Sequence, residues 1–197
     1  MSNEIQRVCV YCGSSHGDDP VFGDAAEAFG RALARRGITL VYGGGLVGLM
    51  GRVADAALGE GGRVTGVIPA GLVRREVAHR GLSDLHVVAT MHERKARMAD
   101  LSDAFVALPG GMGTLDEMCE ILTWAQLGLH TKPCAFLDVA GYYQPLMAFF
   151  DQLVQRRFLK SEHRDIFFVD NEPDRLIDRL ATHRVPEVDK LLDKPKP

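Results

Sequence analysis

Short runs of apolar and β-branched residues alternate along this chain with longer segments in which apolar residues recur at helical spacing. Each short run has the length of one buried strand, and each longer segment has the length of one helix. This order is typical of βαβ units, in which a helix returns the chain so that successive strands lie parallel. We therefore predict an α/β fold with a doubly wound, mostly parallel sheet and helices on both faces.

The predicted elements follow one another regularly along the chain. Strands are expected over seven segments: Arg7–Cys12, Thr39–Tyr42, Val64–Ile68, His86–Ala89, Ala104–Leu108, Cys134–Leu137 and Ile166–Val169. Helices are expected between and after them, over Pro20–Arg36, Leu49–Glu60, Met91–Leu101, Leu115–Leu127, Tyr143–Arg156 and Pro173–Ala181. We expect one Rossmann-like domain over residues 1–185 and a flexible C-terminal tail over residues 186–197, where the sequence ends in LLDKPKP.

Composition and charge argue against two classes of partner. The chain has 197 residues, enough for one domain with a sizeable core, and a formal net charge of −3 at pH 7. Its basic residues are scattered, whereas a nucleic-acid-binding protein concentrates them on one face. The sequence has no apolar run long enough to span a bilayer and no secretory signal at its start. We expect a cytoplasmic protein with no nucleic-acid partner and no membrane partner.

The four cysteines do not indicate a disulfide or a metal site. Cys9 and Cys12 form a C-x-x-C within RVCVYC, but residues three apart on a strand point to opposite faces. Cys119 and Cys134 lie in apolar surroundings, where a buried, inert thiol is common. The histidines show no spacing typical of metal ligands. We predict no disulfide and no metal.

The turns after the strands are the candidate binding segments, because parallel α/β sheets bind ligands beyond the carboxyl ends of their strands. Three are rich in glycine or serine: CGSSHG, YGGGLVGLMG and PGGMGT. The second fits G-x-G-x-x-G through Gly43, Gly45 and Gly48, but the next strand ends in GVIPAGL, without the acidic residue that holds the ribose of NAD. A nicotinamide site is therefore not expected. The same glycines also suit a tight turn with close helix packing.

The third turn has the features of an anion site. Gly110, Gly111 and Gly113 allow backbone N–H groups to converge, and Thr114 opens a predicted helix whose N-terminus favours negative charge. Thr114 and Glu117 also satisfy the T-x-x-E pattern of a capping box, with Thr114 at the N-cap and Glu117 at N3. The spacing leaves two interpretations of Glu117 open, a helix cap and a catalytic carboxylate.

Basic residues cluster in MHERKARM, the segment that follows the fourth strand. Cations are mildly unfavourable at the start of a helix, so local structure does not explain Arg94 and Lys95. Both would lie at the ligand edge of the sheet, beside the strand that leads into PGGMGT, whereas Arg97 fits a solvated face. We expect Arg94 and Lys95 to contribute to an anion site.

Three segments, YGGGLVGLMG, MHERKARM and LPGGMGTLDEMCEILTWAQLG, together resemble the Lonely-Guy family of cytokinin riboside 5′-monophosphate phosphoribohydrolases. The similarity runs from the first strand to about Phe158. It implies hydrolysis of the N-glycosidic bond of adenine-type, N6-modified nucleoside 5′-monophosphates, giving free base (cytokinin or adenine) and ribose 5-phosphate without metal or cofactor. It also implies a homodimer or larger homo-oligomer with the site close to the subunit contact. This family is often labelled lysine decarboxylase, but nothing in the sequence resembles a pyridoxal phosphate site.

The resemblance also implies roles for individual residues. Arg94 and Glu117 match the catalytic pair. The matched substrate-binding positions are Glu76, Lys95, Thr123, Gly44, Gly45, Gly110, Gly111, Met112, Gly113 and Thr114. A carboxylate at position 117 would stabilise the positive charge that develops on the ribose, while the phosphate at the glycine turn anchors the substrate. The alternative is a non-catalytic carrier of a nucleotide or pterin cofactor with a related fold.

Some conspicuous residues have no assigned role in this site. Ser14 and Ser15 in VYCGSS fit the family pattern, but neither receives a function. The aromatic residues of the second half are expected to fill the core or a subunit interface, with stacking on a nucleobase as the alternative: Trp124, Tyr142, Tyr143, Phe149 and Phe150.

Overall fold

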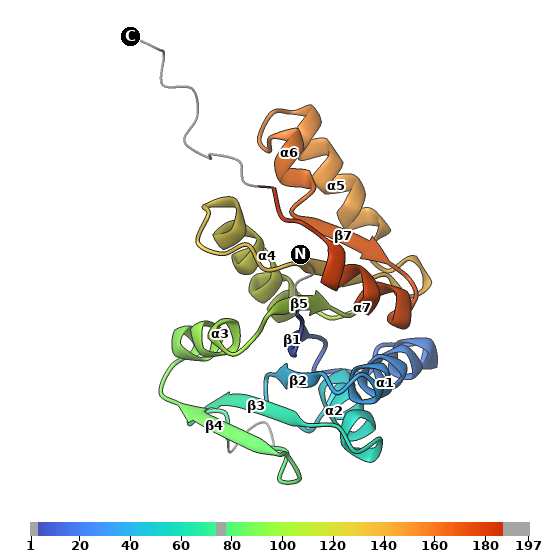
Figure 1. Ribbon diagram of the computed structural model, residues 1–197, viewed down its shortest axis with the longest axis vertical. Helices are drawn as coiled ribbons and strands as arrows, with labels where there is room; N and C mark the ends of the chain where they lie inside the picture. The colour runs from blue at the N-terminus through green and yellow to red at the C-terminus, as the bar shows by residue number, and fades with distance from the viewer. Residues whose placement is uncertain (1–3, 74–77, 187–197) are drawn as a thin grey trace.

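Seven strands form one sheet in the computed structural model, which describes residues 4–73 and 78–186 (Figure 1). The strands are β1 (Arg7–Tyr11), β2 (Thr39–Tyr42), β3 (Val64–Pro69), β4 (Asp84–Val88), β5 (Ala104–Ala107), β6 (Cys134–Leu137) and β7 (Phe167–Asp170). Their order across the sheet is β4-β3-β2-β1-β5-β6-β7, and every ladder between these strands is parallel. The predicted α/β sheet is confirmed.

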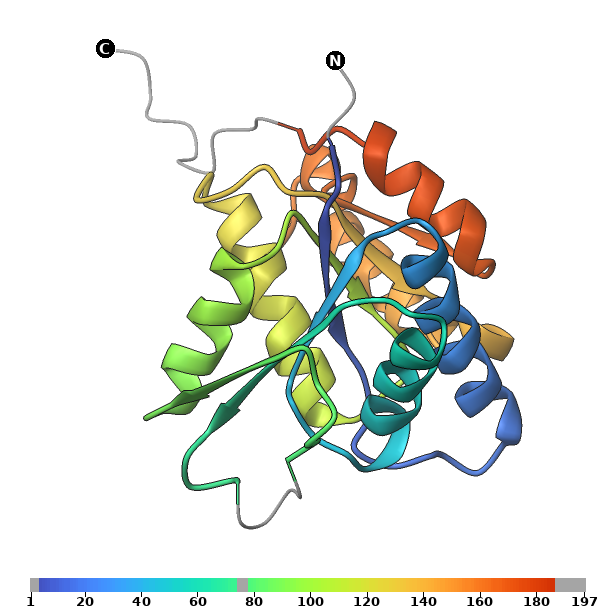
Figure 2. The same ribbon diagram turned by 60° about the horizontal axis from the view of Figure 1, so that its bottom comes forward.

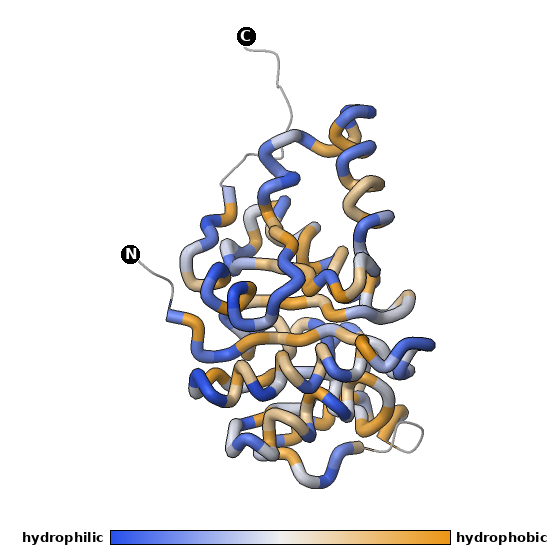
Figure 3. The backbone as a smooth tube through the Cα atoms, turned by 90° about the vertical axis from the view of Figure 1, so that its right-hand side faces the viewer, coloured by the Kyte–Doolittle hydropathy of each residue, from blue (hydrophilic) through white to orange (hydrophobic). Residues whose placement is uncertain are grey.

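Helices cover both faces of the sheet (Figures 1 and 2). One core layer contains buried residues of α1 (Pro20–Arg35), α2 (Gly48–Gly59) and α7 (Pro173–Thr182). The other contains buried residues of α3 (Met91–Asp100), α4 (Met112–Gln126) and α5 (Gln144–Gln155). Apolar residues concentrate along the central strands, and polar residues gather on the outer turns of the helices (Figure 3). The sheet is therefore doubly wound, as predicted.

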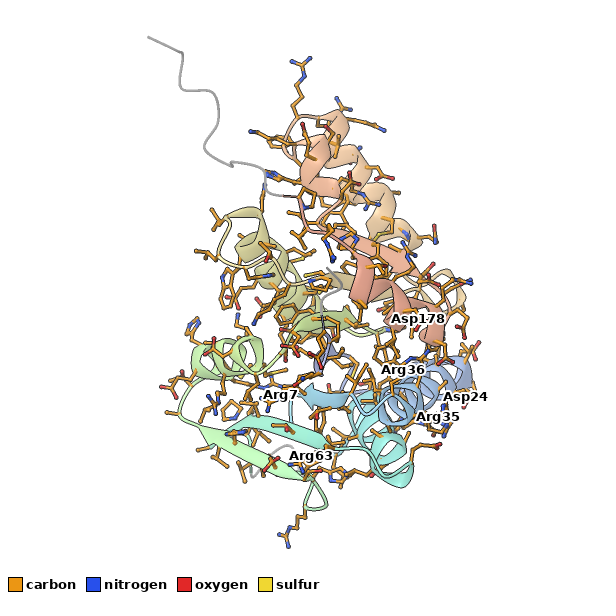
Figure 4. All side chains as sticks on the ribbon, viewed as in Figure 1. Arg7, Asp24, Arg35, Arg36, Arg63 and Asp178 are labelled. Atoms are coloured by element: carbon orange, nitrogen blue, oxygen red, sulfur yellow. The ribbon has the colours of Figure 1, made fainter. Side chains whose placement is uncertain are left out.

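An ion pair between helices supports the first of these layers. Arg36, which follows α1, contacts Asp178 of α7 at 3.3 Å (Figure 4). It also pairs with Asp174 of the same helix. This contact joins the first helix of the chain to the last one described. No helix in residues 4–73 and 78–186 combines the length and the apolar character needed to cross a bilayer.

The cysteines follow the alternation of strand side chains. Cys9 lies in one core layer and Cys12 in the other, which confirms that they do not share a site. The thiols of Cys9, Cys12 and Cys134 are buried, but Cys119 is exposed, so the expectation of a buried thiol there is wrong. Cys119 lies on the outward side of α4, next to Met118, which faces the core.

Most element boundaries lie within two residues of those predicted. The exception is α4, which begins at Met112 rather than Leu115, because the Gly111 carbonyl accepts a hydrogen bond from the Leu115 N–H at 3.2 Å. Two short elements were not predicted, a 3-10 turn η1 (Val139–Gly141) and the helix α6 (Ser161–Arg164). Residues 187–197 of the predicted tail lie outside the described residues.

The strand order reverses at β1, which has β2 on one side and β5 on the other. The turns that leave β1 and β5 lead to opposite faces of the sheet, which creates a crevice at their carboxyl ends. Here the Gly13 N–H donates to the Pro109 carbonyl at 3.0 Å, so the two turns are joined. A pocket of about 370 Å³ lies between them and is lined by both turns. The fold therefore offers its binding crevice where the sequence places PGGMGT.

Candidate functional site

Arg94 is the buried centre of the candidate site. It lies in the first turn of α3, and its guanidinium donates three hydrogen bonds, from Nε to the Val67 carbonyl at 3.1 Å, from Nη2 to the Gly43 carbonyl at 3.2 Å and from Nη1 to Glu117 Oε1 at 2.9 Å. A Cβ on Gly43 would lie 1.8 Å from Nη2, so this position has no room for a side chain. Contacts to β3, to the turn after β2 and to α4 fix the guanidinium in one position.

Glu117 is paired and buried, and it does not cap its helix. Its side chain retains 10% of its exposure, and that of Arg94 retains 9%. The N-cap of α4 is Gly111, without a side-chain hydrogen bond, and Thr114 lies inside the first turn at N3. The capping-box interpretation is therefore wrong, because the helix starts three residues earlier than the sequence pattern indicates. A buried ion pair of this kind makes each charge depend on the other.

Lys95 contacts two carboxylates of α4. Its Nζ lies 3.2 Å from Asp116 Oδ2 and 3.2 Å from Glu120 Oε2, with 12% of the side chain exposed. Burial lowers the pKa of Lys95, but the hydrogen bonds to Glu120 and Asp116 outweigh this effect and raise it. The ammonium therefore stays charged and links α3 to α4. Substrate binding by Lys95 remains a prediction, and an anion would have to compete with both carboxylates for it.

The turn PGGMGT directs its carbonyl groups into the protein. Three consecutive carbonyls accept hydrogen bonds: Leu108 from the Tyr143 hydroxyl at 2.6 Å, Pro109 from the Gly13 N–H at 3.0 Å, and Gly110 from the Tyr142 hydroxyl at 2.6 Å. The Gly111 carbonyl is engaged by the first turn of α4. The negative ends of these peptide dipoles are therefore satisfied within the protein.

The same turn leaves its donors available. Within the described residues, the N–H groups of Gly110, Gly111, Met112 and Gly113 donate no hydrogen bond. These groups precede or begin α4, so the positive end of the helix dipole adds to their partial charges. Consecutive free N–H groups at a helix start are typical of a phosphate site. The geometry thus suits an anion at the residues predicted to bind one.

The other predicted binding residues have different positions. Gly44 and Gly45 follow β2 next to Gly43, and their backbones contact residues 78 and 79. Ser14 and Ser15 are exposed and line the crevice pocket. Glu76 lies outside the described residues. Among the residues that the structure describes, no group of three or more His, Cys, Asp or Glu side chains is placed to hold a metal ion.

Thr123 is not brought to the Arg94–Glu117 pair. Six residues along α4 from Glu117, it lies about 9 Å further along the helix axis and about a third of a turn around it. Its hydroxyl donates to the Cys119 carbonyl at 2.7 Å. Thr123 and Cys119 line an apolar groove between α4, α5 and α6, away from the crevice.

Comparison with known proteins identifies the family. Residues 50–180 match the family model described as "Possible lysine decarboxylase". The probable cytokinin riboside 5′-monophosphate phosphoribohydrolase LOGL2 of Oryza sativa subsp. japonica is 46% identical over 196 residues, which cover 100% of this chain and 80% of that protein. The cytokinin riboside 5′-monophosphate phosphoribohydrolase LOG1 of Arabidopsis thaliana is 44% identical over 194 residues, which cover 98% of this chain and 91% of that protein. The chain belongs to the Lonely-Guy family.

Solved structures share the fold of this Lonely-Guy chain. The molybdenum cofactor binding protein from Rippkaea orientalis superposes with a TM-score of 0.69 at 20% identity, covering 92% of this chain and 98% of that one. The molybdenum cofactor carrier protein from Chlamydomonas reinhardtii also gives a TM-score of 0.69 at 21% identity, covering 91% of this chain and 99% of that one. At this level of identity the likeness shows the fold alone.

Several groups of the candidate site were not predicted from the sequence. The carbonyls of Gly43 and Val67 hold Arg94, but a backbone carbonyl has no signal in residue type. The hydroxyls of Tyr142 and Tyr143 hold the glycine turn. The sequence did contain a clue to these hydroxyls, because two adjacent tyrosines follow β6 at the carboxyl edge of the sheet, where ligands bind.

Proposed function

We propose that this Lonely-Guy protein is an N-glycosyl hydrolase that splits adenine-type, N6-modified nucleoside 5′-monophosphates into free base and ribose 5-phosphate. The observation that carries the proposal is the buried contact of 2.9 Å between Arg94 and Glu117, beside the free N–H groups of the glycine turn. The names of relatives that are 44% and 52% identical support the same reaction. AMP and cytokinin nucleotides are the proposed substrates.

The proposed reaction adds water across the bond between C1′ of the ribose and the base nitrogen. The bond breaks with its electron pair passing to the base, which takes up a proton, while the water oxygen bonds to C1′ and loses one. Positive charge develops on the ribose as the bond breaks. The Glu117 carboxylate stabilises this charge and orients the water, and Arg94 holds the carboxylate in place.

The phosphate anchors the substrate in this scheme. The N–H groups of Gly110, Gly111, Met112 and Gly113 and the N-terminus of α4 supply the donors, and Thr114 lies in the same first turn. Binding energy from the phosphate then positions the glycosidic bond at the catalytic pair. Gly44, Gly45, Lys95, Thr123 and Glu76 remain proposed substrate contacts.

We also propose that a second copy of the chain covers the groove between α4, α5 and α6. The groove has a volume of about 210 Å³, and Leu122, Phe150 and Phe167 are among its lining residues. Phe158 at its edge is 82% exposed. Exposed apolar surface of this kind marks interaction sites. A twofold contact would bring Thr123, a substrate-binding position by family resemblance, to the site of the partner.

The oligomeric state tests this interface. We expect a homodimer or larger assembly by light scattering, and a monomer for the Phe158→Asp variant, because the charge would be buried in the contact. A wild-type monomer at about 10 μM would contradict the proposal, since interfaces of standard size reach lower Kd values.

The rival function is that of a carrier which binds a nucleotide or pterin cofactor without hydrolysing it. Incubation of the purified protein with AMP and N6-isopentenyl-AMP decides between them. Release of adenine or N6-isopentenyladenine supports the hydrolase, and tight binding for hours without free base supports the carrier. EDTA should leave the rate unchanged, because the proposed mechanism uses only side chains and backbone N–H groups.

Location and domain extent are further proposals. We place the protein in the cytoplasm, since buried thiols without disulfides at Cys9, Cys12 and Cys134 suit a reducing compartment. Residues 1–185 are proposed to form the hydrolase domain.

A further inference from the structure

Two adjacent tyrosines hold the glycine turn through their hydroxyl groups. The Tyr142 hydroxyl donates to the Gly110 carbonyl at 2.6 Å, and the Tyr143 hydroxyl donates to the Leu108 carbonyl at 2.6 Å. Tyr142 is 43% exposed and lines the crevice pocket, and its ring packs edge-on against Phe22 with ring centroids 5.6 Å apart. The proposed reaction assigns no role to either hydroxyl.

The Gly110 hydrogen bond also sets the direction of a donor. In a planar trans peptide the C=O of one residue and the N–H of the next point in opposite directions. The described chain contains no cis peptide bond, so a Gly110 carbonyl held by Tyr142 turns the Gly111 N–H away from Tyr142. Tyr143 has no such effect, because its acceptor precedes Pro109, which has no N–H.

Glycines on both sides of this peptide make the hydrogen bond necessary. Gly110 is confined at its Cα, where a Cβ would lie 2.1 Å from Thr114 Oγ1 and 2.7 Å from the Gly13 nitrogen. Its peptide plane with Gly111 has no side chain to restrain it, and glycine populates a wide range of φ and ψ. A flipped peptide would present the carbonyl oxygen to the anion site in place of the N–H. Tyr142 opposes that flip.

We propose that Tyr142 is a positioning residue for the phosphate of the substrate, because its hydroxyl orients the Gly110–Gly111 peptide so that the Gly111 N–H faces the anion. The inference rests on the proposed function and adds to it a residue that acts through the backbone. Tyr143 holds the Leu108 carbonyl just after β5, but it orients no backbone N–H group. The two hydroxyls therefore differ in function although their bonds have the same length.

Tyr142→Phe tests the role, since it removes the hydroxyl and keeps the ring against Phe22. Tyr42→Phe is the matched control: among the described residues, the Tyr42 hydroxyl is the one buried side-chain polar atom without a hydrogen-bond partner. We expect Tyr142→Phe to raise the Kd of ribose 5-phosphate about three- to ten-fold by calorimetry. The kcat/KM for AMP should fall by a similar factor while that for adenosine stays unchanged, and Tyr42→Phe should alter none of these values.

Two results would overturn the role of Tyr142. One is ribose 5-phosphate binding within about two-fold of wild type in the Tyr142→Phe protein, which would mean that the peptide keeps its orientation unaided. The other is an equal loss of kcat/KM for AMP and adenosine, which would indicate a general structural effect. If wild type releases no base from AMP, the proposed reaction fails separately, and the titration with ribose 5-phosphate still decides whether Tyr142 orients the peptide.

Discussion

Arg94 Nη1 lies 2.9 Å from Glu117 Oε1, and both residues are buried, with Arg94 also bonded to β3 and to the turn after β2. Removing one partner leaves the other charge without compensation in a poorly solvated place. Under the proposed function, stability and catalysis therefore depend on the same contact. For substitutions at this pair, the free energy of unfolding and the rate of base release therefore have to be measured separately.

Glu117→Gln should abolish most of the activity at a moderate cost in stability. The amide can still accept from Arg94, but it cannot stabilise a developing cation, so kcat should fall by about 10²-fold or more. The free energy of unfolding should fall by about 1–3 kcal/mol, because the guanidinium loses its counter-charge. Single-turnover base release and urea unfolding measure the two effects. Asp116→Asn, with a side chain 64% exposed on the same helix, is the matched control. Normal turnover in a folded Glu117→Gln protein would move the catalytic assignment elsewhere.

Activity should depend on the 5′-phosphate. The free N–H groups of the glycine turn have no partner in a nucleoside, so that binding energy is lost from the transition state. We expect kcat/KM for AMP to exceed that for adenosine by about 10²-fold or more. Steady-state assays of base release with both compounds give the ratio. Similar values would show that the turn does not bind phosphate.

Gly110→Ala should disrupt the glycine turn, whereas Gly111→Ala should leave the fold intact. The new methyl group at position 110 would lie 2.1 Å from Thr114 Oγ1 and 2.7 Å from the Gly13 nitrogen, so the turns after β1 and β5 must move apart. We expect a loss of about 1–3 kcal/mol in stability and a weaker affinity for ribose 5-phosphate. At Gly111 no atom lies within 4 Å of the added Cβ, and thermal melting should stay near wild type. Equal melting of the two variants would contradict this packing.

Acid should remove the contribution of Asp170 to stability. Burial raises the pKa of this carboxyl, but hydrogen bonds from Arg175 and Arg179 outweigh it and lower the pKa from 3.8 to about 2. Because the folded pKa is the lower one, the stabilisation is complete above the unfolded pKa and is lost as pH falls through about 2. Asp170→Asn should cost about 2 kcal/mol at pH 7, and the difference from wild type should shrink below about pH 4. Urea unfolding of both proteins across this range checks it, and a pH-independent difference would exclude the ionic origin.

The fold followed from periodicity because each buried strand and each amphipathic helix is encoded locally. The start of α4 could not be predicted in this way. Gly111 and Gly113 have low helix propensity, and the pattern from Thr114 to Glu117 matched a capping box at a later helix start. What excludes the cap is the earlier start of α4, with Gly111 at the N-cap; Glu117 instead pairs with Arg94, which is 23 residues away in sequence. The apolar groove around Thr123 was also invisible, because it forms only when α4, α5 and α6 pack together.

The three partners of Arg94 are 51, 27 and 23 residues away from it along the chain. Contacts between such distant segments require large loops to close, so they form slowly compared with helices. During refolding, the circular dichroism of the helices should therefore recover before base release does. If the proposed hydrolysis of AMP holds, its turnover would report in real time when the segments around Arg94 have come together, with no added probe.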